Sequence, residues 1–327
     1  MAGESITIDD IARELGISKT TVSRSISGKG RIGEKTRRRV LDYIAENNYK
    51  PNPLAKGLAQ SKTYNIGWVV PGDSDLTSLS FYQRCMLGVL AAATEADYDV
   101  LITTVFDKDI NGLLRVLENH KVDGVILGRT LLKDPSIKAL KASDTPFVVI
   151  GSTEEKGVVQ IDNDHITACR ELASILKLKG IRRAVFIAGS EDKVVTQTRR
   201  RGFEEGMVGV KTSIYMNCEK NEEVERAVED ALRGKTECII CEDDRICYQV
   251  LDKLKRDNIR VPQQVRIASF YNSRLIEDNQ PAITSLQYDP KALGIQACRT
   301  LLEQINGGTP EQEQMMGYEV LLKASTL

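Results

Sequence analysis

A dense group of basic and hydroxyl side chains lies near the N-terminus. Between Ser18 and Arg39 there are eight Lys or Arg residues and one acidic residue, Glu34. Hydroxyl and basic side chains bind phosphate oxygens, and Lys or Arg can also bind the acceptor edge of guanine. The chemistry predicted for this segment is therefore the binding of a polyanion. Composition alone leaves a merely solvated surface open as the alternative.

The spacing of residues in this segment favours binding. Thr7, followed three positions later by Asp10, is typical of a helix N-cap, and apolar residues then repeat at helical spacing. Gly16 ends this helix, and Ser18 caps a second one over roughly residues 19–27. Two short helices joined by a tight turn form a helix-turn-helix, whose second helix lies in the major groove of DNA.

A third helix is predicted to start at Gly33, with Val40 and Ile44 facing inward. Side chains near its start are favoured as DNA contacts over Arg38 and Arg39. The residues predicted to contact bases or phosphates are Thr7, Ser18, Lys19, Thr20, Thr21, Ser23, Arg24, Lys29, Arg31, Lys35, Thr36 and Arg37.

Charge and composition place the DNA-binding function in one part of the chain. Residues 1–62 hold 12 Lys and Arg against 7 Asp and Glu, whereas the remaining 265 residues hold 33 against 39. The length of 327 residues predicts two or three structural units. Because there is no apolar run of about 20 residues, no secretory signal and only seven scattered cysteines, we expect a soluble cytoplasmic protein with no membrane partner.

Past residue 63, short β-branched runs alternate with helical stretches such as 82–96 and 111–120. Strands are predicted at 65–70, 99–104, 123–127, 146–150, 184–188, 237–241 and 265–269. This alternation is typical of parallel sheets with crossover helices. A ligand of such sheets binds beyond the carboxyl ends of the strands.

The N-terminal segment resembles the LacI/GalR family of bacterial transcription regulators. It contains TVSR, TRRRV, YKPN and IGWVVP in the family's order and spacing, with Gly33 where a serine-type cap is usual. The resemblance implies an α/β protein: an all-α helix-turn-helix head and a two-lobed, periplasmic-binding-protein-like core of parallel sheets flanked by helices. The expected domains are a DNA-binding domain (1–50), a hinge helix and linker (51–63) and a core (64–327). Its first lobe would span about 64–161 and 291–316, and its second about 162–290 and 317–327.

The stretch YKPNPLAKGLAQSK, residues 49–62, looks like a linker but has apolar residues at helical spacing. A helix this short is unstable alone. It resembles the family's hinge helix, which implies that Leu58 wedges between base pairs in the minor groove, whereas Leu54 is expected to pack inward. The residues predicted at the minor groove are Asn52, Ala55, Lys56, Gly57 and Leu58.

The family resemblance and the strand ends together suggest an effector site. The predicted effector-binding residues are Phe81, Tyr82, Arg129, Arg199, Asp243, Asp244 and Asn272. Many sugar-binding relatives have aspartates where this chain has Gly151 and Asn272, and Arg129 adds a positive charge. We therefore hypothesise a carbohydrate-derived effector with an anionic group. The alternative is a neutral sugar, with Arg129 pointing to solvent.

Catalytic motifs are missing from the sequence. The only histidines, His120 and His165, are expected at the surface or in helix caps, and Cys238 and Cys241 are expected as buried thiols on opposite faces of a strand. Glu242–Asp244 is interpreted as a ligand contact or helix cap. We therefore predict no enzyme activity, cofactor or metal.

The function predicted from these observations is sequence-specific transcription regulation. We expect a repressor that binds a pseudo-palindromic operator in double-stranded DNA as a homodimer. A small molecule in the core would control it allosterically. The rival interpretations are an α/β enzyme with a DNA-binding head and a plain solute-binding protein.

Overall fold

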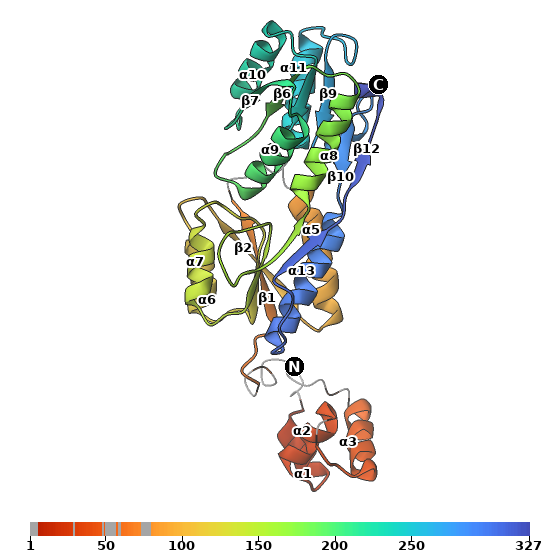
Figure 1. Ribbon diagram of the computed structural model, residues 1–327. Coiled ribbons are helices and arrows are strands. Elements are labelled where there is room, and N and C mark those ends of the chain that lie inside the picture. Colours follow the sequence, from red (N-terminus) through yellow and green to blue (C-terminus); the bar gives the residue numbers. More distant parts are fainter. Residues whose placement is uncertain (1–5, 29, 48, 50–56, 58–59, 73–79) are drawn as a thin grey trace. The chain divides into compact units, whose positions relative to one another are not determined.

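The computed structural model describes residues 6–28, 30–47, 49, 57, 60–72 and 80–327. The chain divides into two compact units, Met1–Thr63 and Tyr64–Leu327 (Figure 1). Within the described ranges, every helix is too short or too polar to span a lipid bilayer.

The first unit consists of helices α1 (Ile8–Glu14), α2 (Lys19–Ser27) and α3 (Glu34–Glu46). Gly16 ends α1 with a φ of +63°, a conformation that glycine adopts without steric cost. This turn brings the Ile17 N–H to 3.0 Å from the Ala12 carbonyl oxygen. The buried apolar core of the unit is Ile11, Ala12, Leu15, Val22 and Val40.

The second unit contains two six-stranded sheets, one in each lobe (Figure 1). The first sheet has the order β11 (Glu313–Met316), β5 (Val159–Asn163), β4 (Phe147–Ile150), β3 (Gly124–Leu127), β1 (Asn65–Pro71), β2 (Asp99–Val105). The second has the order β12 (Glu319–Leu321), β10 (Thr284–Gln287), β9 (Arg266–Ser269), β8 (Cys238–Cys241), β6 (Arg183–Ile187), β7 (Lys211–Tyr215). The strands run parallel except for β12, which is antiparallel to β10.

Helices cover both faces of each sheet, as repeated crossovers require. The helices of the first lobe are α5 (Ser80–Glu95), α6 (Asn111–Glu118), α7 (Pro135–Ala142) and α13 (Pro290–Ile305). Those of the second lobe are α8 (His165–Leu178), α9 (Val194–Gly206), α10 (Asn221–Arg233), α11 (Asp244–Arg256) and α12 (Arg274–Glu277), followed near the C-terminus by the 3-10 turn η2 (Ala324–Thr326). Figure 1 shows α5 and α13 side by side against one face of the first sheet.

The chain passes between the lobes three times: from β5 to α8, from β10 to α13 and from β11 to β12. β5 reaches Asn163, which pairs with Met316 in the first sheet. The first sheet thus extends two residues beyond the boundary expected near residue 161. Three connections at one end of both sheets leave the lobes free to change their relative orientation mainly by hinge bending.

All seven cysteines are free and buried. On β8, Cys238 packs in the core beneath α8 and α9, whereas Cys241 packs in the core beneath α10 and α11. The two thiols therefore face opposite sides of the sheet, as the alternation of a strand predicts. Burial raises the pKa of Cys238 to about 12, so this thiol stays protonated and unreactive.

Candidate functional site

The second helix of the head presents a polar face. Val22 is fully buried and Ile26 is partly buried against the core of the head. Thr20, Ser23 and Arg24 are exposed. Their short or basic side chains are therefore available to base edges and phosphates, as a recognition helix requires.

Two predicted DNA contacts also cap helices. Thr7 and Asp10 form a reciprocal capping box, in which Thr7 Oγ1 accepts from the Asp10 N–H at 3.3 Å and Asp10 Oδ2 accepts from the Thr7 N–H at 3.0 Å. Ser18 Oγ accepts a hydrogen bond from the Thr21 N–H at 3.1 Å and lies 2.9 Å from Thr21 Oγ1. These hydroxyls thus stabilise helix starts in addition to any contact with phosphate.

Two polar side chains of α2 have partners within the head. Lys19 forms an ion pair with Asp9. Both side chains are exposed, so the pair is weak and a phosphate can replace the carboxylate. Ser25 is fully buried and donates a hydrogen bond to the Thr21 carbonyl oxygen at 2.8 Å.

The start of α3 supplies a second group of exposed cations. Gly33 is the N-cap and makes no side-chain hydrogen bond, as its sequence implied. Thr36 is half-buried. The exposed basic residues here are Arg31, Lys35, Arg37, Arg38 and Arg39. Arg37 was predicted as a DNA contact in preference to Arg38 and Arg39, but all three side chains are exposed, so exposure does not test this preference.

Most of the predicted hinge lies outside the described residues. Those positions are Asn52, Leu54, Ala55, Lys56 and Leu58. Lys29, a predicted DNA contact of the head, also lies outside the described residues. Gly57 is described and buried, and its carbonyl oxygen accepts a hydrogen bond from the Lys62 N–H at 3.0 Å.

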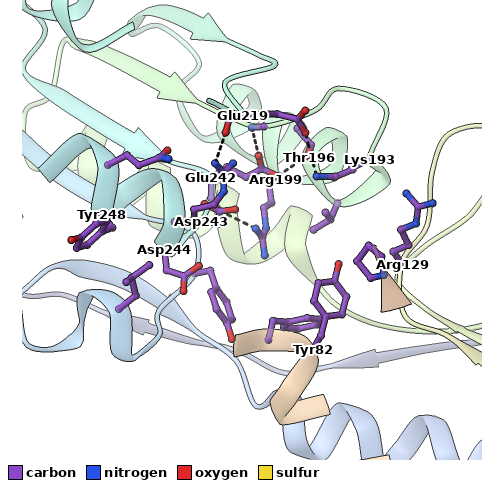
Figure 2. A pocket seen from close by; sticks show the side chains of 18 of the residues that line it. Tyr82, Arg129, Lys193, Thr196, Arg199, Glu219, Glu242, Asp243, Asp244 and Tyr248 are labelled. Atoms are coloured by element: carbon purple, nitrogen blue, oxygen red, sulfur yellow. Dashed lines mark hydrogen bonds and ion pairs between the residues drawn. The ribbon is translucent and has the colours of Figure 1, made fainter. Parts of the chain in front are cut away.

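A cleft of about 940 Å³ lies between the two lobes of residues 64–327 (Figure 2). Six of the seven predicted effector residues line it: Phe81, Tyr82, Arg129, Arg199, Asp243 and Asp244. Much of the remaining wall comes directly after strands, for example Gly128 after β3, Gly151 after β4 and Gly189 near the end of β6. The cleft therefore lies at the carboxyl ends of both sheets, where ligands of parallel sheets bind.

Arg129 does not point into solvent. The residue is 7% exposed, and its Nη1 forms an ion pair with Asp107. Its Nε and Nη2 are buried without a hydrogen-bond partner among the described residues. Asp107, two residues beyond β2, was not predicted from the sequence as part of the cleft.

Arg199 is held by the loop that follows β8. Its Nη1 donates to the Glu242 carbonyl oxygen at 3.0 Å, and its Nε is buried with no partner in the described part of the chain. The Glu242 side chain accepts from the Gly189 N–H and the Thr196 hydroxyl, each at 2.6 Å (Figure 2). Burial and the neighbouring Asp243 raise the pKa of Glu242. Glu242 thus ties α9 to the strand ends that position Arg199.

The two predicted aspartates have different roles. Asp243 caps α11, because its Oδ1 accepts a hydrogen bond from the Ile246 N–H at 2.8 Å. Asp244 is buried and accepts a hydrogen bond from the Ser273 hydroxyl. Burial and the adjacent Asp243 raise the pKa of Asp244 to about 6. Its charge therefore changes just below neutral pH.

Aromatic rings from both lobes form one face of the cleft. The rings of Phe81 and Tyr82 on α5 meet edge to face at 5.4 Å, and Phe81 contacts Tyr271 of the second lobe at 6.0 Å. Such rings provide flat apolar surface for a sugar or planar ligand. Burial raises the pKa of Tyr82 to about 12, so its hydroxyl remains a hydrogen-bond donor at neutral pH.

His165 is buried in the cleft wall, so the expectation that it lies at the surface or only caps a helix was wrong. Its Nε2 lies 3.4 Å from Asp162 Oδ1, and its Nδ1 lies 3.2 Å from the Tyr288 hydroxyl. Burial lowers the pKa of His165, which keeps the imidazole neutral near pH 7. His120 is exposed, as expected.

The two positions at which sugar-binding relatives have aspartates behave differently. Asn272 is not among the residues that line the described cleft; it is buried, and its Nδ2 donates to Gln287 Oε1 at 2.8 Å. Gly151 lines the cleft with a φ of +116°. A Cβ atom there would come within 2.8 Å of Thr130 Oγ1. The positive φ and this close contact therefore disfavour an aspartate at this position.

Two loops join the lobes beside the cleft, and we call residues 130–132 and 192–194 the clasp. The Leu132 N–H donates to the Asp192 carbonyl oxygen at 2.9 Å, and the Val194 N–H donates to the Thr130 carbonyl oxygen at 3.2 Å. Leu131 and Lys193 form an antiparallel β-bridge. The clasp joins the lobes through backbone hydrogen bonds and was not predicted from the sequence.

Three of the cleft residues that sequence reasoning missed lie at or after the ends of strands. Asp107 comes after β2, and Asp162 lies near the end of β5 with His165 three residues later. The rule that ligands bind beyond strand ends would have found Asp107. It could not find the other two residues, because β5 was not recognised as a strand.

Each of the two units matches a known protein-family model. The family model described as "Bacterial regulatory proteins, lacI family" matches residues 7–52, and that described as "Periplasmic binding protein-like domain" matches residues 173–326.

Relatives match nearly the whole chain. The HTH-type transcriptional regulator RegA of Clostridium saccharobutylicum is 27% identical over 98% of this chain and 99% of its own. The solved structure of a transcriptional regulator CelR–cellobiose complex is 25% identical, with a TM-score of 0.71 over 98% of this chain and 99% of the other.

A structure titled as a probable maltose operon transcriptional repressor MalR of Staphylococcus aureus is 25% identical, with a TM-score of 0.75 over 81% of this chain and 98% of the other. The head, the two-lobed core and these matches agree. The chain belongs to the lacI family of bacterial regulatory proteins and is a DNA-binding transcription regulator.

Proposed function

We propose that this protein is an effector-controlled repressor that binds a pseudo-palindromic operator as a dimer. The observation that carries the proposal is the cleft of about 940 Å³ in a chain that also has a helix-turn-helix. A cavity of this volume accommodates a small molecule. The relatives named as transcription regulators support a regulatory role.

The effector proposed for the cleft is a sugar or a sugar derivative. Two observations support this choice: the aromatic face formed by Phe81, Tyr82 and Tyr271, and the titles of the two solved relatives, which name cellobiose and a maltose operon. Aromatic faces and convergent polar groups are the usual components of such sites.

The dimer is proposed to form through an exposed apolar face of the first lobe. Leu87 and Leu90 on α5 are 54% and 37% exposed, and Ile102 on the adjacent β2 is 54% exposed. β2 pairs only with β1 among the described strands, so its other edge is open. Exposed apolar residues next to an open strand edge are typical of an interaction surface. Two-fold symmetry would then place two heads on two half-sites.

Control by the effector requires two arrangements of the lobes with different ligand affinities. The three connections between the lobes and the clasp supply the elements for such a change.

Leu58 is proposed as the residue that wedges into the minor groove. Replacing Leu58 by alanine should reduce both operator affinity and DNA bending in a circular-permutation gel assay, and unchanged bending would contradict the wedge.

Operator binding provides the test. The full-length protein is used to select DNA from a random library, and the selected duplex is compared with a duplex that carries one half-site. We expect salt-sensitive binding to the full site and much weaker binding to the half-site. Arg24→Ala should cost about 1–3 kcal/mol of binding free energy. The matched control is Arg200→Ala, which removes a charge from α9. Selection of no specific sequence would refute the proposal.

A further inference from the structure

Arg129 is a buried cation that uses only part of its hydrogen-bonding capacity. Its Nη1 is paired with Asp107, whereas Nε and Nη2 have no partner among the described residues and are shielded from solvent. Buried polar groups in native proteins are almost always paired, because an unpaired group loses its hydration without compensation. An arginine left in this state in the wall of a cleft calls for a ligand.

The two unpaired atoms define the geometry of that ligand. The N–H bonds of Nε and Nη2 lie in one plane and point the same way, so they form a two-pronged donor edge. Two oxygens of a carboxylate or a phosphate match this edge, whereas one hydroxyl group satisfies only half of it. Asp107 occupies Nη1 and leaves this edge unused.

Over the cleft as a whole, the unpaired buried donors of the described lining residues outnumber the unpaired buried acceptors. Arg199 Nε is a third buried N–H without a partner, and Gln249 Oε1 is the one unpaired buried acceptor among the described lining residues. The buried carboxylates already accept hydrogen bonds from protein groups: Asp162 from the Ser152 hydroxyl, Glu242 from the Thr196 hydroxyl and Asp244 from the Ser273 hydroxyl. The cleft therefore needs acceptor atoms from its ligand.

The two arginines act on the same part of the cleft. The positive charges of Arg129 and Arg199 both oppose the rise in the pKa of Tyr82 that burial causes. Tyr82 belongs to the first lobe and Arg199 to the second (Figure 2). An anion bound here would attract groups of both lobes. It would also lie next to the clasp, since Thr130 follows Arg129 in the chain.

We propose that Arg129 is the oxyanion-binding residue of the cleft and that the effector carries a carboxylate or a phosphate group. The inference rests on the proposed function of the cleft as an effector site. It assigns to Asp107 the role of a positioning residue, which holds the guanidinium group with its Nε–Nη2 edge unpaired.

The test uses the full-length protein and matched sugars: glucose, glucuronate, gluconate and glucose 6-phosphate, with inorganic phosphate as the smallest probe. Binding is measured by isothermal titration calorimetry and by thermal shift. We expect an acidic sugar to bind at least tenfold more tightly than glucose. A preference for glucuronate and gluconate would identify a carboxylate, and a preference for glucose 6-phosphate a phosphate.

Three variants locate the anion. Arg129→Met should lower the affinity for the acidic ligand at least tenfold and leave glucose binding unchanged. Arg129→Lys keeps the charge without the two-pronged edge and should lose affinity to an intermediate degree. Arg200→Met is the control, because Arg200 is paired with Glu204 on the outer part of α9 and does not line the described cleft.

Three results would overturn the inference. Tighter binding of glucose than of every acidic sugar would show a neutral effector and leave the proposed function intact. Equal affinity of wild type and Arg129→Met for the anion would place the anion elsewhere. If no neutral or acidic compound bound while operator binding persisted, the effector role of the cleft would fail together with the inference.

Discussion

Replacing Val194 with proline tests whether the clasp holds the lobes together. Val194 is the first residue of α9, where proline is tolerated because its N–H is not needed within the helix. The preceding residue, Lys193, has φ −81° and ψ 130°, which suits a residue before proline. Val194→Pro should therefore remove the hydrogen bond to Thr130 without disrupting α9.

The size of the effect follows from the burial of Thr130. This residue is 6% exposed, so its carbonyl oxygen would lose its donor while the lobes stay together and would regain one from water when they separate. Leaving a buried acceptor unpaired costs about 1–3 kcal/mol. The ratio of closed to open molecules should therefore fall roughly 5- to 150-fold.

The matched control is Val194→Ala, which trims the side chain but keeps the N–H. We would measure the distance between spin labels on the two lobes by pulsed electron resonance, together with the affinity of the cleft ligand by calorimetry. We expect Val194→Pro to broaden the distance distribution and to weaken ligand binding relative to Val194→Ala. Distances and affinities within twofold of the alanine variant would refute the role of the clasp.

Three further predictions concern the core. Asp244→Asn should raise the free energy of unfolding by up to about 3 kcal/mol at pH 7.5, because the pKa of about 6 lies above the ordinary 3.8. This gain should shrink as the pH falls through 6 towards 4, because wild-type Asp244 becomes neutral there. Urea titrations at several pH values measure the gain and its pH dependence. A gain that does not change with pH would show that the raised pKa of Asp244 is not its cause. Gly151→Asp should destabilise the core by about 1–3 kcal/mol, because of its positive φ and the contact with Thr130. A melting temperature equal to that of the wild type, measured by circular dichroism, would disprove this prediction. Leu87→Lys should weaken dimerisation in analytical ultracentrifugation, whereas Leu178→Lys, at a leucine that is 83% exposed in the second lobe, should not.

Local signals made the head predictable from its sequence. Thr7, Gly16 and Ser18 each act within a few residues: a cap, a positive φ and a second cap. The periodicity of apolar residues then fixed which faces pack together. The burial of Ser25 was missed, because a serine that donates to its own helix backbone looks polar in sequence and is nevertheless buried.

Strands without apolar character were the main failure in the core. β5 is buried throughout, yet it includes Gln160, Asp162 and Asn163. Hydrogen bonds compensate for the burial of two of them: Gln160 Oε1 accepts from the Thr153 N–H at 2.7 Å, and Asp162 Oδ2 accepts from the Ser152 hydroxyl at 2.7 Å. The side-chain amide of Asn163 has no partner among the described residues. β7 is an edge strand with an exposed start, so its sequence has little apolar signal.

Long-range contacts were beyond reach for a different reason. The bridge between Leu131 and Lys193 joins residues 62 positions apart through backbone atoms, so no side-chain pattern encodes it. Arg129 was predicted as a cleft residue because it follows a strand, but its partner Asp107 depends on how two loops meet. Asn272 follows a strand as well and turns instead towards Gln287.

Because every cysteine is buried, the reactivity of each thiol reports local opening of the core around it. A thiol reacts as the thiolate, and burial both blocks reagents and raises the pKa of groups such as Cys85, Cys169 and Cys298. Modification of a given thiol therefore requires that its part of the core opens first. The order in which an alkylating reagent marks the seven positions, read by mass spectrometry with and without ligand, would rank the segments of both lobes by the free energy of their opening.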